Sequence, residues 1–159
     1  MDVVLVSKLH SEDWEDALTR LCIYAIKQGY AEPTLLDAII DRERRCPTGF
    51  PVDGNRGVAL PHEDIVYTKR PAVIIARPMP PLLFGRMDNA RENVTAFLIF
   101  MVLADDVERY PKTFEKLTSL LRNIESVEKL RKMRVPELKQ LMLSSLGNEM
   151  AGFVTVELG

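Results

Sequence analysis

The residues best suited to chemistry form one short run, Gly57-Val58-Ala59-Leu60-Pro61-His62, which contains one of the chain's two histidines. An apolar run between glycine and proline is typical of a short buried strand. Because proline has a fixed φ and donates no hydrogen bond to a sheet, Pro61 is expected to end the strand and turn His62 out of it. A reactive imidazole could meet solvent and a partner there, although a lone histidine at a strand end is more often an ordinary surface residue.

A second candidate is Arg42, in a helix that we expect to begin at Pro33. The apolar stripe of this helix passes through Leu35, Ala38 and Ile39, and the next position on it is Arg42. Two interpretations fit this placement. The arginine either complements the negative end of the helix dipole, with its neighbouring arginines, or reaches into a site from the edge of the core.

The elements that position these two residues follow from hydrophobic spacing. Residues 3–6 are expected to form a first strand, and Ser11 is expected to cap an amphipathic helix that ends at Gly29. Turn-forming residues occupy 47–55 and lead into the strand before His62. The two candidates therefore lie on either side of one turn-rich connection.

Four later segments have strand character. Ala72–Ala76 is a β-like run, and Leu82–Phe84, which follows several prolines, is at most a short edge strand. Val94–Ala104 is apolar almost throughout, which predicts a central strand buried on both faces. Phe153–Leu158 alternates and is expected to pair with a sheet edge or with a partner.

Helices are expected between these last two strands. Apolar residues at helical spacing mark a third helix around 114–121, Ser126 is expected to cap a short helix to Leu130, and Pro136 to open one that reaches Leu146. Strands with helices before and after them predict an α/β (α+β) fold, in which helices cover both faces of a mixed sheet. Because no linker or repeat interrupts the pattern, we expect a single domain over residues 1–159.

Composition excludes several classes of protein. A net charge of −2 and a pI of about 5.8 give no basic footprint, so no nucleic-acid partner is expected. Cys22 and Cys46 lack the histidine spacing of a zinc site, and we predict reduced thiols, no metal and no cofactor. Cys46 as a nucleophile would need a general base at a recognisable spacing, and none is found. The longest apolar run is too short to cross a bilayer and the N-terminus has no basic leader, so we expect a cytoplasmic protein without membrane insertion.

These motifs resemble the enzyme IIA domains of the bacterial sugar phosphotransferase system, of the fructose–mannitol type. The family signature Gly-aliphatic-Ala-aliphatic-Pro-His corresponds to residues 57–62, its Arg-Glu pair to Arg42-Glu43, and the end of its third helix to Leu120-Leu121-Arg122-Asn123. The resemblance covers nearly the whole chain in order. Cys46-Pro47-Thr48-Gly49 is similar to the segment of the galactitol group.

The resemblance implies the enzyme IIA mannitol-type fold and a phosphocarrier role. His62 would accept phosphate from the phosphorylated carrier HPr, and Arg42 would steady the phosphoryl group. The phosphate would then pass to a cysteine of a cognate IIB component, which works with a membrane IIC permease to take up a galactitol-like sugar. Two alternatives stay open: a regulatory module, like the nitrogen-related IIA proteins, whose phosphorylation controls a protein contact, or a fold that has lost the chemistry.

Two positions depart from the family pattern. Tyr110 falls where mannitol-type members carry a second active-site histidine, and it is a possible donor because a phenol can donate a hydrogen bond to phosphate. Glu63 replaces a residue that is often small, and its carboxylate would repel a phosphoryl group unless it points away. Thr48 and Glu63 complete the predicted substrate-binding residues, and His10 is expected to be an ordinary surface residue.

Overall fold

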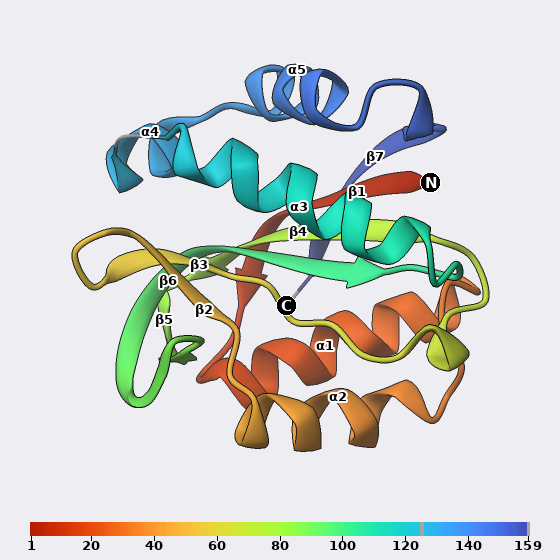
Figure 1. Ribbon diagram of the computed structural model, residues 1–159, viewed down its shortest axis with the longest axis horizontal. Helices are drawn as coiled ribbons and strands as arrows, with labels where there is room; N and C mark the ends of the chain where they lie inside the picture. The colour runs from red at the N-terminus through yellow and green to blue at the C-terminus, as the bar shows by residue number, and fades with distance from the viewer. Residues whose placement is uncertain (125, 159) are drawn as a thin grey trace.

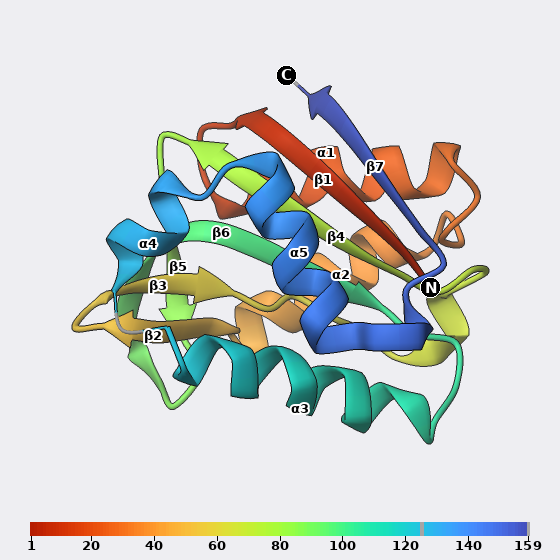
Figure 2. The same ribbon diagram turned by 90° about the horizontal axis from the view of Figure 1, so that it is seen from above.

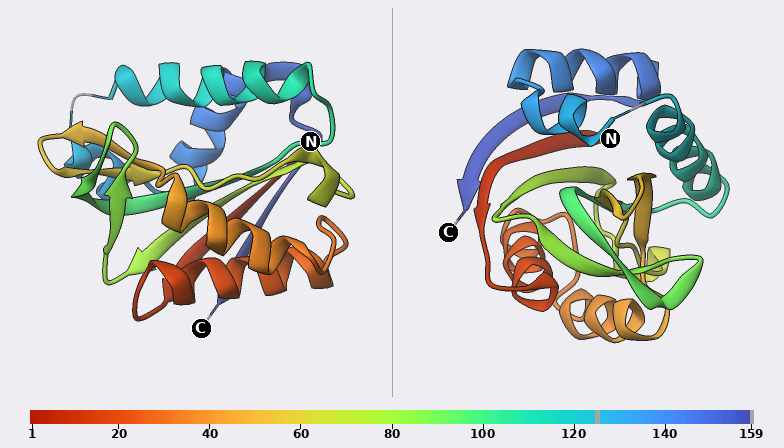
Figure 3. Two further views of the ribbon diagram at one scale, coloured as in Figure 1. Left: turned by 60° about the horizontal axis from the view of Figure 1, so that its bottom comes forward. Right: turned by 90° about the vertical axis from the view of Figure 1, so that its left-hand side faces the viewer.

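A mixed sheet lies between two layers of helices in the computed structural model, which describes residues 1–124 and 126–158 (Figure 1). Figure 2 looks down on one layer, and the right-hand view of Figure 3 shows the sheet between the two layers. The predicted α/β (α+β) class, with helices on both faces of a mixed sheet, is therefore confirmed. One layer holds α3 (Arg109–Arg122), α4 (Val127–Lys132) and α5 (Val135–Leu146), and the other holds α1 (Trp14–Lys27) and α2 (Leu35–Arg45).

The described residues form one seven-stranded sheet. Strand β1 runs parallel to its two neighbours β4 and β7, whereas β6 is antiparallel to both β4 and β5. The spatial order is β3 (Arg56–Ala59), β2 (Gly49–Asp53), β5 (Leu82–Arg86), β6 (Asn89–Leu103), β4 (Ala72–Met79), β1 (Asp2–His10) and β7 (Gly152–Leu158).

The 15-residue strand β6 organises the sheet around the candidate site. It pairs with β4 and β5 along one edge and with β3, in parallel, along the other. Its buried part confirms the central strand predicted at Val94–Ala104, although the strand begins earlier, in the exposed hairpin to β5. Because β3 also pairs with β2, strands β2, β3, β6 and β5 close a ring of pairings. Gly57 lies where this ring is tightest: a Cβ there would collide with the carbonyl oxygen of Phe50.

The C-terminal strand lies at the free edge of the sheet. β7 pairs in parallel with β1, as expected for a tail that adds to a sheet edge. β1 is longer than predicted and extends to His10, because its pairing with β4 continues to Met79. His10 is exposed, as expected, but it belongs to the end of a strand.

Three predictions about these elements are wrong: the cap of one helix, the start of another and the position of one strand in the sheet. Asp13, not Ser11, caps α1 and accepts a hydrogen bond from the Asp16 amide at 2.8 Å, because the extended β1 leaves Ser11 inside the turn that follows it. α2 begins at Leu35, since Pro33 belongs to the preceding turn. β5 is not an edge strand, because the first residue of β2, Gly49, pairs with its last residue.

The sheet divides the core into two apolar clusters. Alternate residues of β1 face opposite layers: Val4 and Val6 pack towards α1 and α2, Val3 and Leu5 towards α3, α4 and α5. The segment after β3 runs between α3 on one side and α1 and α2 on the other, so it can receive side chains from both layers (Figure 1). In the described parts of the chain, no helix is long and apolar enough to cross a membrane.

Candidate active site

His62 is held by the central strand. β3 ends at Ala59, but the next residues continue beside β6: the Val102 amide donates to the Pro61 carbonyl at 3.1 Å, and His62 forms an isolated parallel bridge with Val102. The regular strand thus ends two residues before Pro61. The expectation that Pro61 turns His62 out of the sheet is wrong, because His62 still bridges β6. The backbone of His62 is consequently anchored to the buried part of β6.

The contacts of the His62 ring determine its tautomer. Nδ1 lies 2.8 Å from the carbonyl oxygen of Leu60, which can only accept, so Nδ1 carries the proton. Nε2 then holds the lone pair and lies 3.4 Å from Nη2 of Arg42. Burial lowers the pKa of His62 below its usual 6.5, the hydrogen bond to Leu60 opposes this, and the nearby Arg42 lowers it further. The ring is therefore neutral at pH 7, with a nucleophilic Nε2.

Two aromatic side chains of α3 pack against this imidazole. The ring centroids of Tyr110 and Phe114 lie 5.7 and 5.0 Å from that of His62. Desolvation raises the pKa of the Tyr110 phenol, which keeps its proton, and its buried hydroxyl has no hydrogen-bond partner among the described residues. Tyr110 thus lies beside the imidazole with a donor unused, at the position where the resemblance predicts one.

Arg42 lies between the imidazole and a carboxylate. Its Nη1 is 3.4 Å from Oε1 of Glu63, while its Nη2 is 3.4 Å from the His62 ring. Glu63 is turned towards Arg42 and its side chain is only 11% exposed. The Nε atom of Arg42 is buried without a partner among the described residues. Of the two interpretations of this arginine, the geometry agrees with the one in which it reaches into a site.

Thr48, predicted as a substrate contact, has a different position. It is 2% exposed and does not line the pocket at His62. Its hydroxyl lies 2.8 Å from Oε1 of Glu43 and accepts from the Leu60 amide at 3.2 Å, and its own amide donates to Glu43 at 2.9 Å. The prediction is corrected accordingly: all its polar groups bind protein because the connection folds back against α2.

Glu43 is the residue whose role the sequence analysis missed. It is 4% exposed and binds Thr48, whose hydroxyl accepts from the amide of Leu60, the residue whose carbonyl orients His62. Burial raises the pKa of Glu43 to about 7, while the hydrogen bonds from Thr48 oppose the shift. The sequence does contain a sign of this burial. Glu43 follows Leu35 and Ile39 at intervals of four residues, and these three are the buried residues of α2.

Arg42, His62 and Tyr110 border a pocket of about 430 Å³, which Thr48 and Glu43 do not line. Its mouth is apolar: Val66 and Val107 are 69% and 71% exposed and are the most exposed large aliphatic residues in the described chain. Cys46 is exposed and does not line this pocket. The polar lining combines a neutral nucleophile, a guanidinium, a phenol and the two carboxylates of Glu63 and Asp64. The lining includes Arg42, His62, Glu63, Val66, Val107, Tyr110 and Pro111.

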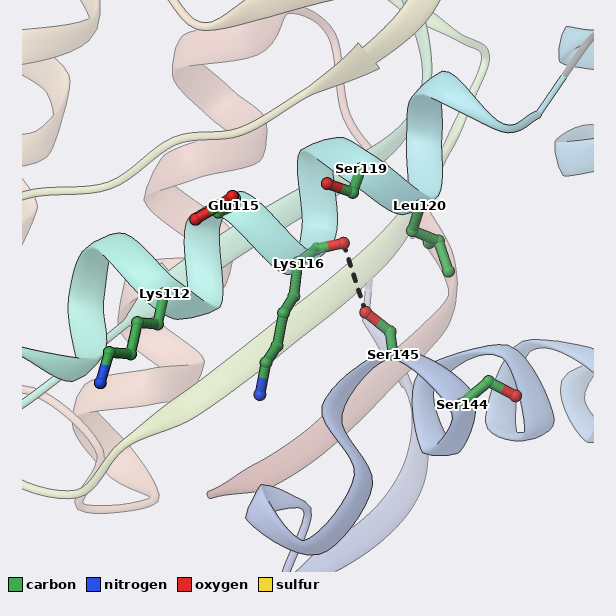
Figure 4. A pocket seen from close by; sticks show the side chains of 7 residues that line it. All are labelled: Lys112, Glu115, Lys116, Ser119, Leu120, Ser144 and Ser145. Carbon is green, nitrogen blue, oxygen red and sulfur yellow. Dashed lines mark hydrogen bonds between the residues drawn. The ribbon is translucent and has the colours of Figure 1, made fainter.

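A second depression, of about 480 Å³, lies between α3 and α5 (Figure 4). Lys112 and Lys116 border it, and the one hydrogen bond drawn there joins the Ser145 hydroxyl to the Lys116 carbonyl at 3.4 Å. Its lining contains neither histidine nor cysteine, so it offers no imidazole or thiol as a nucleophile. The pocket at His62 is therefore the candidate active site.

Comparisons with known proteins agree with this geometry. Residues 1–142 match the family model described as "Phosphoenolpyruvate-dependent sugar phosphotransferase system, EIIA 2". The galactitol-specific EIIA component of Escherichia coli strain K12 is 24% identical over 128 residues, which cover 80% of this chain and 84% of that protein.

Two solved structures have the same fold. The crystal structure of mannitol IIA from Escherichia coli has a TM-score of 0.68 at 23% identity, over 87% of this chain and 94% of that one. The complex of enzyme IIAMtl with phosphorylated enzyme IIBMtl from Escherichia coli matches with a TM-score of 0.70 at 21% identity, over 88% and 94%. The expected mannitol-type fold and phosphotransferase class are thus confirmed, and the chain belongs to the EIIA 2 family of the phosphoenolpyruvate-dependent sugar phosphotransferase system.

Proposed function

We propose that Nε2 of His62 accepts a phosphoryl group from the phosphorylated carrier HPr and passes it to a cysteine of a cognate IIB component. One observation carries the proposal. The Nδ1 proton is held by the Leu60 carbonyl, so the nitrogen with the free lone pair is the one beside Arg42. That arrangement presents a neutral nucleophile and a cation to the same incoming group.

The proposed transfer is an in-line displacement. The Nε2 lone pair forms a bond to phosphorus, while the bond to the donor breaks and its electron pair returns to the donor. Positive charge that develops on the imidazole is stabilised by the Leu60 carbonyl at Nδ1. Arg42 and the unused Tyr110 hydroxyl would bind the phosphoryl oxygens, where charge accumulates in the transition state.

The exposed residues around the mouth of the pocket favour docking of other proteins. Val66 and Val107 flank it and leave apolar surface exposed beside the nucleophile. Exposed aliphatic surface at the rim of a polar site is typical of a place where another protein docks. We propose that HPr and the IIB component use this same rim in turn, because each must bring its reactive atom to Nε2.

Further parts of the proposal rest on the relatives. The galactitol-specific EIIA component supports a galactitol-like sugar, and the solved complex of a IIA with a phosphorylated IIB supports a IIB partner. The chain would then act in the cytoplasm beside a membrane IIC permease. We also propose a single domain over residues 1–159, because β1 and β7, from opposite ends of the chain, pair in one sheet.

The test is phosphorylation in a reconstituted system. Incubation with phosphoenolpyruvate, enzyme I and HPr should add one acid-labile phosphate to the wild-type protein and none to His62→Gln. His10→Gln is the matched control, because His10 is exposed at the end of β1 and should leave labelling intact. Normal labelling of His62→Gln would overturn the assignment. A phosphohistidine that no cognate IIB discharges would instead favour the regulatory alternative.

A further inference from the structure

The residue after the nucleophile shares the arginine of the site. Oε1 of Glu63 lies 3.4 Å from Nη1 of Arg42, and the same guanidinium places Nη2 3.4 Å from Nε2 of His62. The same carboxylate oxygen is also held by the backbone, because Oε1 accepts a hydrogen bond from the Asp64 amide at 2.9 Å. With a side chain only 11% exposed, Glu63 is held in this orientation and is poorly screened by water.

Phosphorylation would change the charge balance of this group of residues. In the free protein, one cation faces one carboxylate and a neutral ring. A phosphoryl group on Nε2 would carry between one and two negative charges within reach of the same cation, and the ring, which keeps its Nδ1 proton, would offset about one of them. Arg42 would then face two anions with a single positive charge. Glu63 must either remain, and repel the phosphoryl group, or leave, and lose its pairing with Arg42.

Both outcomes raise the free energy of the phosphorylated state relative to the free state. We infer that Glu63 competes with the phosphoryl group for Arg42 and thereby favours donation of the phosphoryl from His62 to the acceptor. The inference rests on the proposed phosphocarrier function. Glu63 acts through Arg42, so it is a residue that tunes transfer and not a nucleophile or an acid.

The cycle is balanced in atoms and electrons. When an acceptor thiolate attacks phosphorus, an S–P bond forms, the N–P bond breaks and its electron pair returns to Nε2. That lone pair again accepts from Nη2 of Arg42, and Nη1 pairs again with Glu63, which restores the arrangement seen in the structure. The proton stays on Nδ1, hydrogen-bonded to the Leu60 carbonyl, throughout.

A different role for Glu63 makes the opposite prediction. If the carboxylate only holds Arg42 in position for the phosphoryl group, its removal should weaken phosphorylation. If it competes, its removal should strengthen phosphorylation and slow discharge. The sign of the change in equilibrium constant therefore separates the two roles.

The experiment measures the equilibrium constant for phosphoryl exchange between HPr and this protein, with phospho-His62 quantified by ³¹P NMR. Glu63→Gln keeps the acceptor for the Asp64 amide and removes the charge. We expect the equilibrium constant to rise roughly five-fold, as for loss of one partly buried charge, and discharge to IIB to slow by a similar factor. Glu63→Asp, which keeps the charge, should stay closer to wild type than Glu63→Gln.

Asp64→Asn is the matched control. Asp64 also lines the pocket, but its carboxylate is exposed, accepts from the Val66 amide and forms no ion pair with Arg42 among the described residues. Asparagine removes its charge and preserves the acceptor. Its effect should be under about two-fold, because water screens an exposed charge. An unchanged or lower equilibrium constant in Glu63→Gln, or an equal rise in Asp64→Asn, would refute the inference. Absence of phosphate on wild-type His62 would refute the proposed function itself, so the two failures are distinguishable.

Discussion

Nδ1 of His62 lies 2.8 Å from the carbonyl oxygen of Leu60, two residues earlier in the chain. The amide of the same Leu60 donates to the Thr48 hydroxyl at 3.2 Å, and that hydroxyl binds the buried Glu43. Leu60 thus connects the nucleophile, through Thr48, to the buried Glu43 side chain of α2. Its carbonyl selects the tautomer, and its amide is held by a network that solvent does not reach.

The tautomer and titration of His62 can be measured directly. ¹⁵N NMR should show a protonated Nδ1 and an unprotonated Nε2 at pH 7. The ring should gain its second proton only below pH 6.5, because burial lowers its pKa. His62→Gln assigns the signals, since the chain has only two histidines. A protonated Nε2 at neutral pH would contradict the proposed nucleophile.

Arg42→Lys should slow phosphorylation roughly ten-fold with the fold intact. Lysine keeps the charge but loses the planar fork that faces both His62 and the phosphoryl oxygens, a loss of about one charge-assisted hydrogen bond. Single-turnover labelling by phospho-HPr measures the rate. Arg44→Lys is the control, because Arg44 pairs with Glu15 and does not line the pocket. Unfolding of Arg42→Lys, with normal transfer in the folded fraction, would support a purely structural arginine.

Tyr110→Phe should weaken transfer by about 0.5–1.5 kcal/mol, the contribution of one neutral hydrogen bond. The same change should slightly stabilise the free protein, because the phenol hydroxyl is buried without a partner among the described residues. Tyr110→His should preserve or raise the rate. Transfer rates and urea unfolding check the two effects separately. Indifference of the rate to both substitutions would show that Tyr110 takes no part in transfer.

Glu43 should make stability depend on pH. Its pKa is about 7 in the folded protein, above the ordinary 4.5, so folding favours its protonated form. The resulting stabilisation is fully present below pH 4.5 and is lost as pH rises through about 7, by up to about 3 kcal/mol. Urea unfolding at pH 5 and pH 8 should reveal a fall that Glu43→Gln largely removes. Identical pH dependence in the two proteins would show that Glu43 stays charged.

The apolar rim should matter for partner binding and not for folding. Val66→Ser removes a 69% exposed aliphatic side chain beside the pocket and should raise the KM for phospho-HPr about five-fold, as for a contact worth about 1 kcal/mol. Leu83→Ser, at a 57% exposed position on β5, is the control. Equal effects of the two changes would exclude a specific role for the rim.

Local patterns were enough to predict much of the site. An apolar run followed by Pro61 predicted the strand that presents His62, since proline limits the backbone whatever packs around it. Helical spacing predicted the buried stripe of α2 through Leu35 and Ile39, although it continues to Glu43 and not to Arg42. The predicted sheet with helices on both faces is present. These features depend on residues close together in the chain, whose periodicity reflects burial.

The exact ends of several elements depended on pairing between distant strands. Ser11 has the side chain of a good N-cap. However, the pairing of β1 with β4 continues to His10, so α1 begins later and Asp13 caps it. The prolines before β5 argued for an edge strand, yet β2 closes the ring beside it. Local propensity cannot predict such pairings, because their energy comes from partners far away in the chain.

The functional side chains show the same division. The sequence identified His62 and Arg42 by residue type and position, and the family resemblance added Tyr110; in the structure all three line one pocket. Only the tertiary structure determined that Thr48 binds Glu43 inside the protein and that Glu63 turns towards Arg42. The direction in which a polar side chain points depends on which partners the fold brings within hydrogen-bond distance, and those partners come from separate elements of the chain.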